Sequence, residues 1–289
     1  MDERIFGEES LAKISCCQMK PEIGDRVGNL ESALDWIKAS VEEGGDLIIL
    51  PELCISGYVF NSREEAYSLA EAVPGGESIK TLEDAANEHQ VHIVAGLAEE
   101  EDSCIYNTAV LVGPDGYIGK YRKLHLWYEE HLFFEEGDLG LPVFYTPWGR
   151  IGLMVCYDMW FPEISRIYAA MGADLLVVPT NWPEPRDIGG ITDITDKLLI
   201  TQAHMNSVYI AACDRVGYER GVTFKGRSII IDPSGEVVAG PGSSDSEEII
   251  MSDCNLSDSR NKRKSRYNDA LKDRRIDVYD KFLGYHENG

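Results

Sequence analysis

The sequence contains no hydrophobic run long enough to cross a membrane. Its longest apolar runs, such as residues 47–50 and 175–178, fall far short of the roughly 18 residues that a spanning helix needs. The first residues, MDERIFGEESLAK, are charged and lack the apolar centre of a secretory signal. The seven cysteines are an odd number and show no CxxC or Cys/His ligand spacing, so we interpret most of them as buried thiols. We therefore predict a cytoplasmic protein.

Positive charge is also scarce. The chain of 289 residues has 27 Lys and Arg against 50 Asp and Glu, a formal net charge of -23. Such a charge repels phosphate backbones and anionic bilayers, which disfavours nucleic acid and membrane partners. Apolar residues make up 44% of the chain, and glycine and proline occur at ordinary levels, which excludes a disordered or collagen-like chain.

Apolar strands alternate with amphipathic helices along the chain. An apolar stripe at spacings of three and four predicts a helix over residues 27–41, which the glycine pair at 44–45 ends. Further helices are predicted at 78–89, from 162 to about 172, and at 196–206, and strands at 13–19, 47–50, 91–97, 108–112, 151–155, 175–178 and 209–213. Turns at 113–116 and 232–235 join later strands into hairpins. The pattern predicts one α/β domain, residues 1–289, with a mixed sheet covered by helices and a core of about 12–255.

The segment from 259 to 279 is basic in an otherwise acidic chain. This concentration of charge favours docking on an acidic surface such as that of a second subunit, and the alternative is a solvated tail. We predict that the C-terminal tail, residues 256–289, lies at a subunit interface.

Three predicted strands run directly into residues with catalytic chemistry. Glu52 follows the apolar run 47–50, Lys123 lies among apolar and aromatic residues, and Cys156 ends the strand 151–155. Taken singly, each has a structural explanation: a capping Glu, a surface Lys, a buried Cys. Together they supply a base, a cation for a developing oxyanion and a nucleophile. A thiol at a strand-to-helix turn is expected to be exposed near helix N–H groups, which lower its pKa.

The segments around these residues are LPELCISGY, YRKLHL and GLMVCYDMWFPE, supported by PGG, YNTAVLVGPDG, GRSIIIDPSG and DRRIDVY. In this order and spacing they resemble the nitrilase superfamily of carbon-nitrogen hydrolases across nearly the whole chain. The resemblance implies an αββα sandwich that forms a four-layer αββααββα arrangement in a homodimer or higher homo-oligomer.

The resemblance also implies roles. Glu52 is then the general base, Lys123 stabilises the tetrahedral intermediate, and Cys156 attacks the carbonyl. A second glutamate assists Lys123, and the match is to Glu130, with Glu129 as its immediate neighbour. No metal or organic cofactor is expected.

Several other residues are assigned around this group. The backbone N–H of Tyr157 completes the oxyanion hole by the same resemblance, and the predicted pocket lining comprises Tyr58, Phe60, Tyr157, Trp160 and Trp182. His125 is interpreted as structural. Asp158 is expected to cap the next helix or to bind backbone N–H groups.

Tyr157 and Asp158 follow the cysteine as in amidase-type members, whereas true nitrilases usually have Trp-Glu there. No Arg follows closely to bind a substrate carboxylate, so a small neutral or cationic amide is favoured. An N-carbamoyl amine is the alternative, because residues 160–163 resemble those of N-carbamoylputrescine amidases. A nitrile comes next, and a non-catalytic binding subunit is disfavoured because all three catalytic residue types are present.

Overall fold

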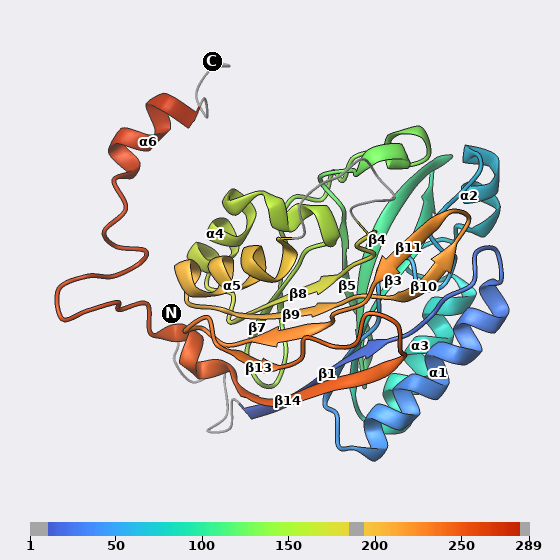
Figure 1. Cartoon of the computed structure of the whole chain (residues 1–289), viewed down its shortest axis with the longest axis horizontal. Coiled ribbons are helices and arrows are strands. Elements are labelled where there is room, and N and C mark those ends of the chain that lie inside the picture. Colours follow the sequence, from blue (N-terminus) through green and yellow to red (C-terminus); the bar gives the residue numbers. More distant parts are fainter. Residues whose placement is uncertain (1–10, 185–193, 284–289) are drawn as a thin grey trace.

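The computed structural model describes residues 11–184 and 194–283, and the N-terminal stretch used to exclude a secretory signal lies largely outside them. Two six-stranded sheets face each other. Helices cover the outer face of each sheet, as Figure 1 shows. The predicted αββα sandwich is therefore confirmed.

The first sheet has the order β14-β1-β2-β3-β4-β5. Its central strands β1, β2 and β3 are parallel, and β4, β5 and β14 pair antiparallel to their neighbours. The bounds are Leu11–Gln18 (β1), Leu47–Ile49 (β2), His92–Glu101 (β3), Cys104–Gly113 (β4), Gly116–Arg122 (β5) and Glu248–Asn255 (β14), with helices Arg26–Glu42 (α1), Arg63–Leu69 (α2) and Glu77–His89 (α3) between β1 and β3.

The second sheet repeats this arrangement in the order β13-β12-β9-β8-β7-β6. Its bounds are Val143–Tyr145 (β6), Arg150–Leu153 (β7), Leu175–Pro179 (β8), Tyr209–Cys213 (β9), Ile229–Ile231 (β12) and Val237–Ala239 (β13), with helices Pro162–Met171 (α4) and Thr195–Asn206 (α5). Again three parallel strands are flanked by antiparallel ones. A separate hairpin, Val216–Glu219 (β10) and Val222–Lys225 (β11), was not predicted.

Successive side chains of β1 point alternately into two different apolar clusters of the core. Cys16 belongs to the apolar cluster between the sheets, whereas Cys17 packs with Ala33 and Ile37 of α1. This is the expected period of two in a strand buried on both faces. Among the described residues all seven cysteines are free thiols and all but Cys104 are buried, as the sequence predicts.

The helix ends follow local signals. Asp25 precedes α1 and its side chain accepts a hydrogen bond from the N–H of Gly28. Pro162 opens α4, and Gly172 ends it with a φ of 89° that only glycine adopts at little cost. No helix in the described part of the chain has the length and apolar character needed to span a membrane.

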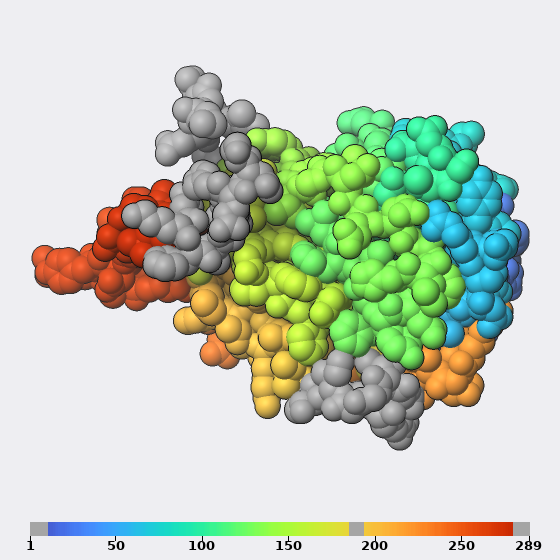
Figure 2. Space-filling model, turned by 90° about the horizontal axis from the view of Figure 1, so that it is seen from above, coloured from blue at the N-terminus to red at the C-terminus, as the bar shows by residue number. Residues whose placement is uncertain are grey.

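The C-terminal segment begins on the body of the molecule and then leaves it. Leu256 and Ser259 in the 3-10 helix η4 (Leu256–Arg260) are fully buried. From residue 261 the chain extends as an arm that ends in helix α6 (Ile276–Leu283), the red projection in Figures 1 and 2. Tyr267, Ile276 and Tyr279 on this arm are exposed. The segment that can reach another molecule is therefore shorter than the predicted tail.

Two lysines of the arm donate hydrogen bonds to other parts of the same chain. The ammonium of Lys262 donates to the carbonyls of Asn206 and Ser207 at the C-terminal end of α5, and Lys264 donates to that of His204. Cations are favoured there because the helix dipole is negative at this end. For these two lysines the partner is the chain's own helix, and the predicted acidic surface on a second subunit is not required.

Deletion of residues 261–289 tests the role of the arm. We expect the full chain to sediment as a dimer or larger oligomer and the truncated chain at a lower mass, because exposed apolar side chains on an extended arm need a partner surface. Sedimentation velocity provides the measurement. A full chain that sediments as a monomer would contradict the interface prediction.

Candidate active site

The carboxyl ends of strands from both sheets meet at one place. Glu52 lies just after β2, Lys123 directly after β5, Cys156 after β7 and Asn181 after β8. The side-chain amide of Asn181 donates to the carbonyl oxygen of Glu52 at 2.8 Å, which ties the two sheets together here. Strand ends of this kind are where α/β proteins build their sites.

Lys123 lies between two carboxylates. Its Nζ donates to Oε1 of Glu52 and to Oε1 of Glu130, both at 2.7 Å. The side chains of Lys123 and Glu52 are fully buried and that of Glu130 is 4% exposed. The Lys123 backbone N–H pairs with the carbonyl of Asn107, and the Asn107 amide donates to Glu52 Oε1 at 2.7 Å. The structure thus brings Glu52, Lys123 and Glu130 together.

Burial and the neighbouring charges shift the pKa values of Lys123 and Glu52 in opposite directions. Burial lowers the pKa of Lys123, but Glu130 and Glu52 outweigh it and hold that pKa above its usual value. Burial raises the pKa of Glu52 to about 7 despite the attraction of Lys123. Lys123 therefore stays charged near neutral pH, while Glu52 can hold or release a proton there.

Cys156 has a strained backbone and a buried thiol. It has a φ of 49°, in the left-handed region, at the start of the 3-10 helix η2 (Cys156–Trp160), and its exposure is 3%. Burial raises its pKa well above the usual value, Glu52 adds to this effect, and Lys123 and the backbone N–H of Asn181 oppose it. The expectation of an exposed thiol with a lowered pKa was wrong, because the facing sheet excludes water from the turn. A thiol with a raised pKa needs a base before it can act as a thiolate nucleophile.

Asp158 holds the turn after Cys156 in place. Its carboxylate accepts hydrogen bonds from the backbone N–H groups of Val155 and His125 and from the Tyr121 hydroxyl, at 3.0, 3.1 and 2.7 Å. The His125 ring lies 2.8 Å from the same carboxylate and stacks on Phe161. Both residues thus have structural contacts of the kind expected from the sequence.

Tyr58 reaches the group of Glu52, Lys123 and Glu130 from a loop that the β10–β11 hairpin positions. Glu219 Oε1 accepts from the backbone N–H groups of Tyr58 and Val59 at 2.8 and 2.5 Å, while Arg215 donates to Glu219 Oε2 at 2.7 Å. The Tyr58 hydroxyl then donates to Glu130 Oε1 at 2.5 Å. Burial and the neighbouring Glu130 raise the pKa of Tyr58 well above its usual value, so it acts as a neutral donor.

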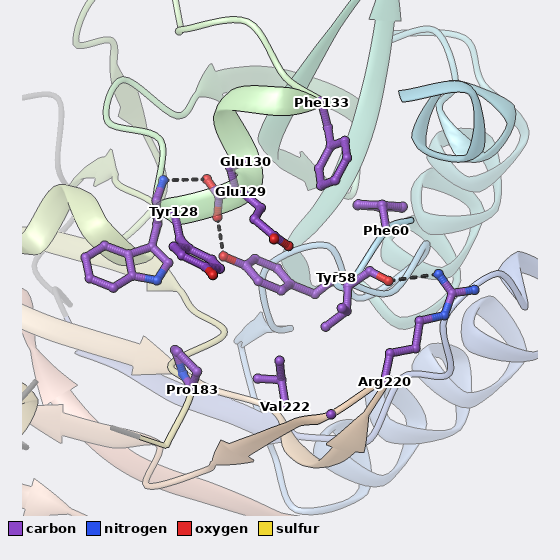
Figure 3. Close-up of a pocket in the computed structure, with 12 residues that line it drawn as sticks. Tyr58, Phe60, Tyr128, Glu129, Glu130, Phe133, Pro183, Arg220 and Val222 are labelled. Carbon is purple, nitrogen blue, oxygen red and sulfur yellow. Dashed lines mark hydrogen bonds between the residues drawn. The ribbon is translucent and has the colours of Figure 1, made fainter. Parts of the chain in front are cut away.

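A cavity of about 270 Å³ opens beside this group, and we call it the outer cavity (Figure 3). Of the predicted pocket residues, Tyr58 and Phe60 line it, together with Val59, Trp127, Tyr128, Glu129, Glu130, Phe133, Pro183, Arg220, Gly221 and Val222. Tyr157, Trp160 and Trp182 are outside this lining. Tyr157 and Trp160 pack on Trp127 with centroid distances of 4.7 and 6.5 Å, and Trp182 is buried.

Sequence reasoning missed several residues of the site. Asn181 follows the predicted strand 175–178, so the strand-end rule applied to Glu52 and Cys156 would have found it. Asn107 and Trp127 carry no such signal. Within residues 11–184 and 194–283, no cluster of three or more His, Cys, Asp or Glu side chains could hold a metal ion.

The family model, the relatives and the solved structures that match this chain all indicate one family. The model of the carbon-nitrogen hydrolase family matches residues 13–264. A nitrilase from Pyrococcus abyssi is 41% identical over 93% of this chain and 99% of its own length, and an N-carbamoylputrescine amidase from Solanum lycopersicum is 32% identical over 87% and 88%. A solved structure of a mutant amidase from Nesterenkonia sp. AN1, with the acetamide moiety of fluoroacetamide added covalently at its active-site cysteine, has a TM-score of 0.78, 25% identity and coverage of 96% and 99%.

The geometry predicts how stability depends on Lys123. Lys123→Met leaves the buried carboxylates of Glu52 and Glu130 facing each other, and we expect the free energy of unfolding to fall by about 3 kcal/mol or more. The loss should grow from about pH 5 to about pH 8.5, because acid protonates one carboxyl and relieves the repulsion. Urea unfolding at both pH values measures it.

The double variant Lys123→Met/Glu52→Gln is the control. Removal of one carboxylate should cancel most of the pH-dependent part of the loss. If Lys123→Met lowers the free energy of unfolding equally at both pH values, charge repulsion is not the cause. The same conclusion follows if adding Glu52→Gln leaves that loss unchanged.

Proposed function

The chain belongs to the carbon-nitrogen hydrolase family of the nitrilase superfamily, and on that premise we propose that it hydrolyses a small amide and releases ammonia. The observation that carries the proposal is the buried ammonium of Lys123 between Glu52 and Glu130, beside the Cys156 thiol. Such a group can move a proton, form a covalent bond and stabilise an oxyanion without further components.

In the first half of the reaction, Glu52 takes the proton of the Cys156 thiol while the sulfur attacks the amide carbonyl carbon. The electron pair of the carbonyl moves to oxygen, and Lys123 and the backbone N–H of Tyr157 stabilise the oxyanion. Glu52 then returns the proton to the amide nitrogen, the C–N bond breaks, and ammonia leaves a thioester on Cys156.

In the second half, Glu52 accepts a proton from water, and the hydroxide attacks the thioester carbon. The second tetrahedral intermediate has the same oxyanion donors. The C–S bond then breaks, the proton returns to the sulfur, and the carboxylic acid is released. Glu130 serves throughout as a positioning residue, because it holds the ammonium of Lys123 and is held itself by the hydroxyl of Tyr58.

The substrate class rests on the two residues immediately after Cys156. Tyr157 and Asp158 resemble the residues at these positions in amidase-type members, and this resemblance favours an amide. An N-carbamoyl amine is the alternative, supported by the similarity to N-carbamoylputrescine amidases. A nitrile comes third, as the substrate class of the nitrilase-type relatives. The proposal also includes a cytoplasmic homodimer or larger homo-oligomer, and no cofactor.

Ammonia release from a panel of amides, carbamoyl amines and nitriles tests the proposal. We expect the highest kcat/KM with a small amide, and a loss of at least about a thousandfold in Cys156→Ala because the nucleophile is gone. Cys104→Ser, which alters a thiol on β4 away from the site, is the matched control and should retain wild-type turnover. Near-normal turnover in Cys156→Ala would refute the covalent mechanism.

The pH dependence tests Glu52 as the base. Because its pKa is raised to about 7 and the base must be ionised, kcat/KM should rise with pH through about 7 and fall about tenfold per unit below it. Glu52→Gln keeps the size of the side chain and should retain less than about a tenth of the wild-type rate at every pH. A rate that is flat between about pH 5 and about pH 8, or a highly active Glu52→Gln, would remove Glu52 from this role.

A further inference from the structure

The outer cavity adjoins the group of Glu52, Lys123 and Glu130 through two shared residues. Tyr58 and Glu130 belong both to the hydrogen bonds around Lys123 and to the cavity lining. A substrate whose carbonyl carbon lies at Cys156 therefore has this cavity available for its remaining atoms. Its volume of about 270 Å³ suits a short chain and not a large ring system.

Three charged side chains line the outer cavity, and two of them are already neutralised. Glu130 accepts from Lys123 and Tyr58 through Oε1 and from the backbone N–H of Trp127 through Oε2. Arg220 binds both carboxylate oxygens of Glu65 at 2.7 Å and the carbonyl of Val59. Neither Glu130 nor Arg220 therefore has an unpaired charge that a ligand could bind.

Glu129 differs from both. Its carboxylate has no hydrogen bond or ion pair with any residue in the described ranges 11–184 and 194–283, and Figure 3 shows it extending into the cavity near the ring of Tyr58. Aromatic rings line the space around it, contributed by Tyr58, Phe60, Trp127, Tyr128 and Phe133. Glu129 is exposed to solvent, and a carboxylate beside aromatic rings is the chemistry that recognises an ammonium group.

We propose that the outer cavity binds the ammonium end of the substrate, with Glu129 as its counter-ion and the aromatic rings as its walls. The inference rests on the proposed amide hydrolysis and names the substrate class, a short amide or carbamoyl amine with a terminal primary amine. A substrate carboxylate is disfavoured, because Glu129 repels it and the Arg220 guanidinium is held by Glu65.

Three primary amides of similar length test the inference: δ-aminovaleramide, which is cationic, hexanamide, its neutral isostere, and glutaramate, which is anionic. At low salt kcat/KM for δ-aminovaleramide should exceed that for hexanamide about tenfold, and glutaramate should be the poorest. The preference should lie mainly in KM, since the ammonium is bound equally in the ground and transition states, and it should shrink as salt screens the charge.

Glu129→Gln should bring the ratio for δ-aminovaleramide over hexanamide close to one. Glu136→Gln is the matched control, because it removes the same charge from an exposed residue close in the sequence that does not line the cavity, and it should keep the wild-type ratio. Equal kcat/KM for the two amides in the wild type, or a ratio that Glu129→Gln does not alter, would overturn the inference.

Calorimetric titration of the Cys156→Ala protein with the same amides separates this inference from the proposed function. If no amide is hydrolysed, the proposed function fails, and the subsite is then judged from Kd alone. Tighter binding of δ-aminovaleramide than of hexanamide supports the subsite, and equal binding or none overturns it.

Discussion

The structure around the site follows from one constraint, the burial of the Lys123 ammonium. A lone ammonium in a dry interior costs several kcal/mol, and close carboxylates offset that cost, although Oε2 of Glu52 is itself buried without a hydrogen-bond partner among the described residues. Glu52 and Glu130 provide the opposite charge. Asn107 and Tyr58 each donate a further hydrogen bond to these carboxylates. The same arrangement that makes the ammonium tolerable also leaves Glu52 with a pKa at which proton transfer is easy.

A second buried ion pair, Arg215–Glu219, holds in position the groups around Lys123. Glu219 lies in the β10–β11 hairpin and Arg215 just before it, far in the sequence from the three candidate motifs. Glu219 nevertheless holds the backbone at Tyr58 and so determines where the tyrosine hydroxyl can reach. Arg215 is itself fixed by the carbonyl of Pro21 and lies 4.4 Å from the centre of the Phe224 ring. The precision of the Glu130 contact thus depends on residues that no local motif marks.

Most of the regular elements and the three catalytic candidates could be predicted from the sequence, because apolar periodicity and strand-end position are local signals. Helix 27–41, for example, differs from α1 by one residue at each end. The burial of Cys156 could not be predicted, since it depends on how closely the second sheet packs against the first. Trp160 and Trp182 are aromatic and near the motifs, but aromatic character does not tell cavity lining from core. The β10–β11 hairpin has short strands with little apolar alternation, so it escaped notice.

The order of the candidate site residues along the chain has a consequence for how the protein is made. Glu52, Asn107, Lys123 and Glu130 all precede the first strand of the second sheet, and Cys156 follows it. During synthesis from the N-terminus the ammonium and its carboxylates can therefore pair on the first sheet while water still reaches them, and the second sheet then dehydrates a pair that already exists. Cys156 joins them only in that docking step, so a nascent chain carries the charged groups before the thiol that we propose as the nucleophile.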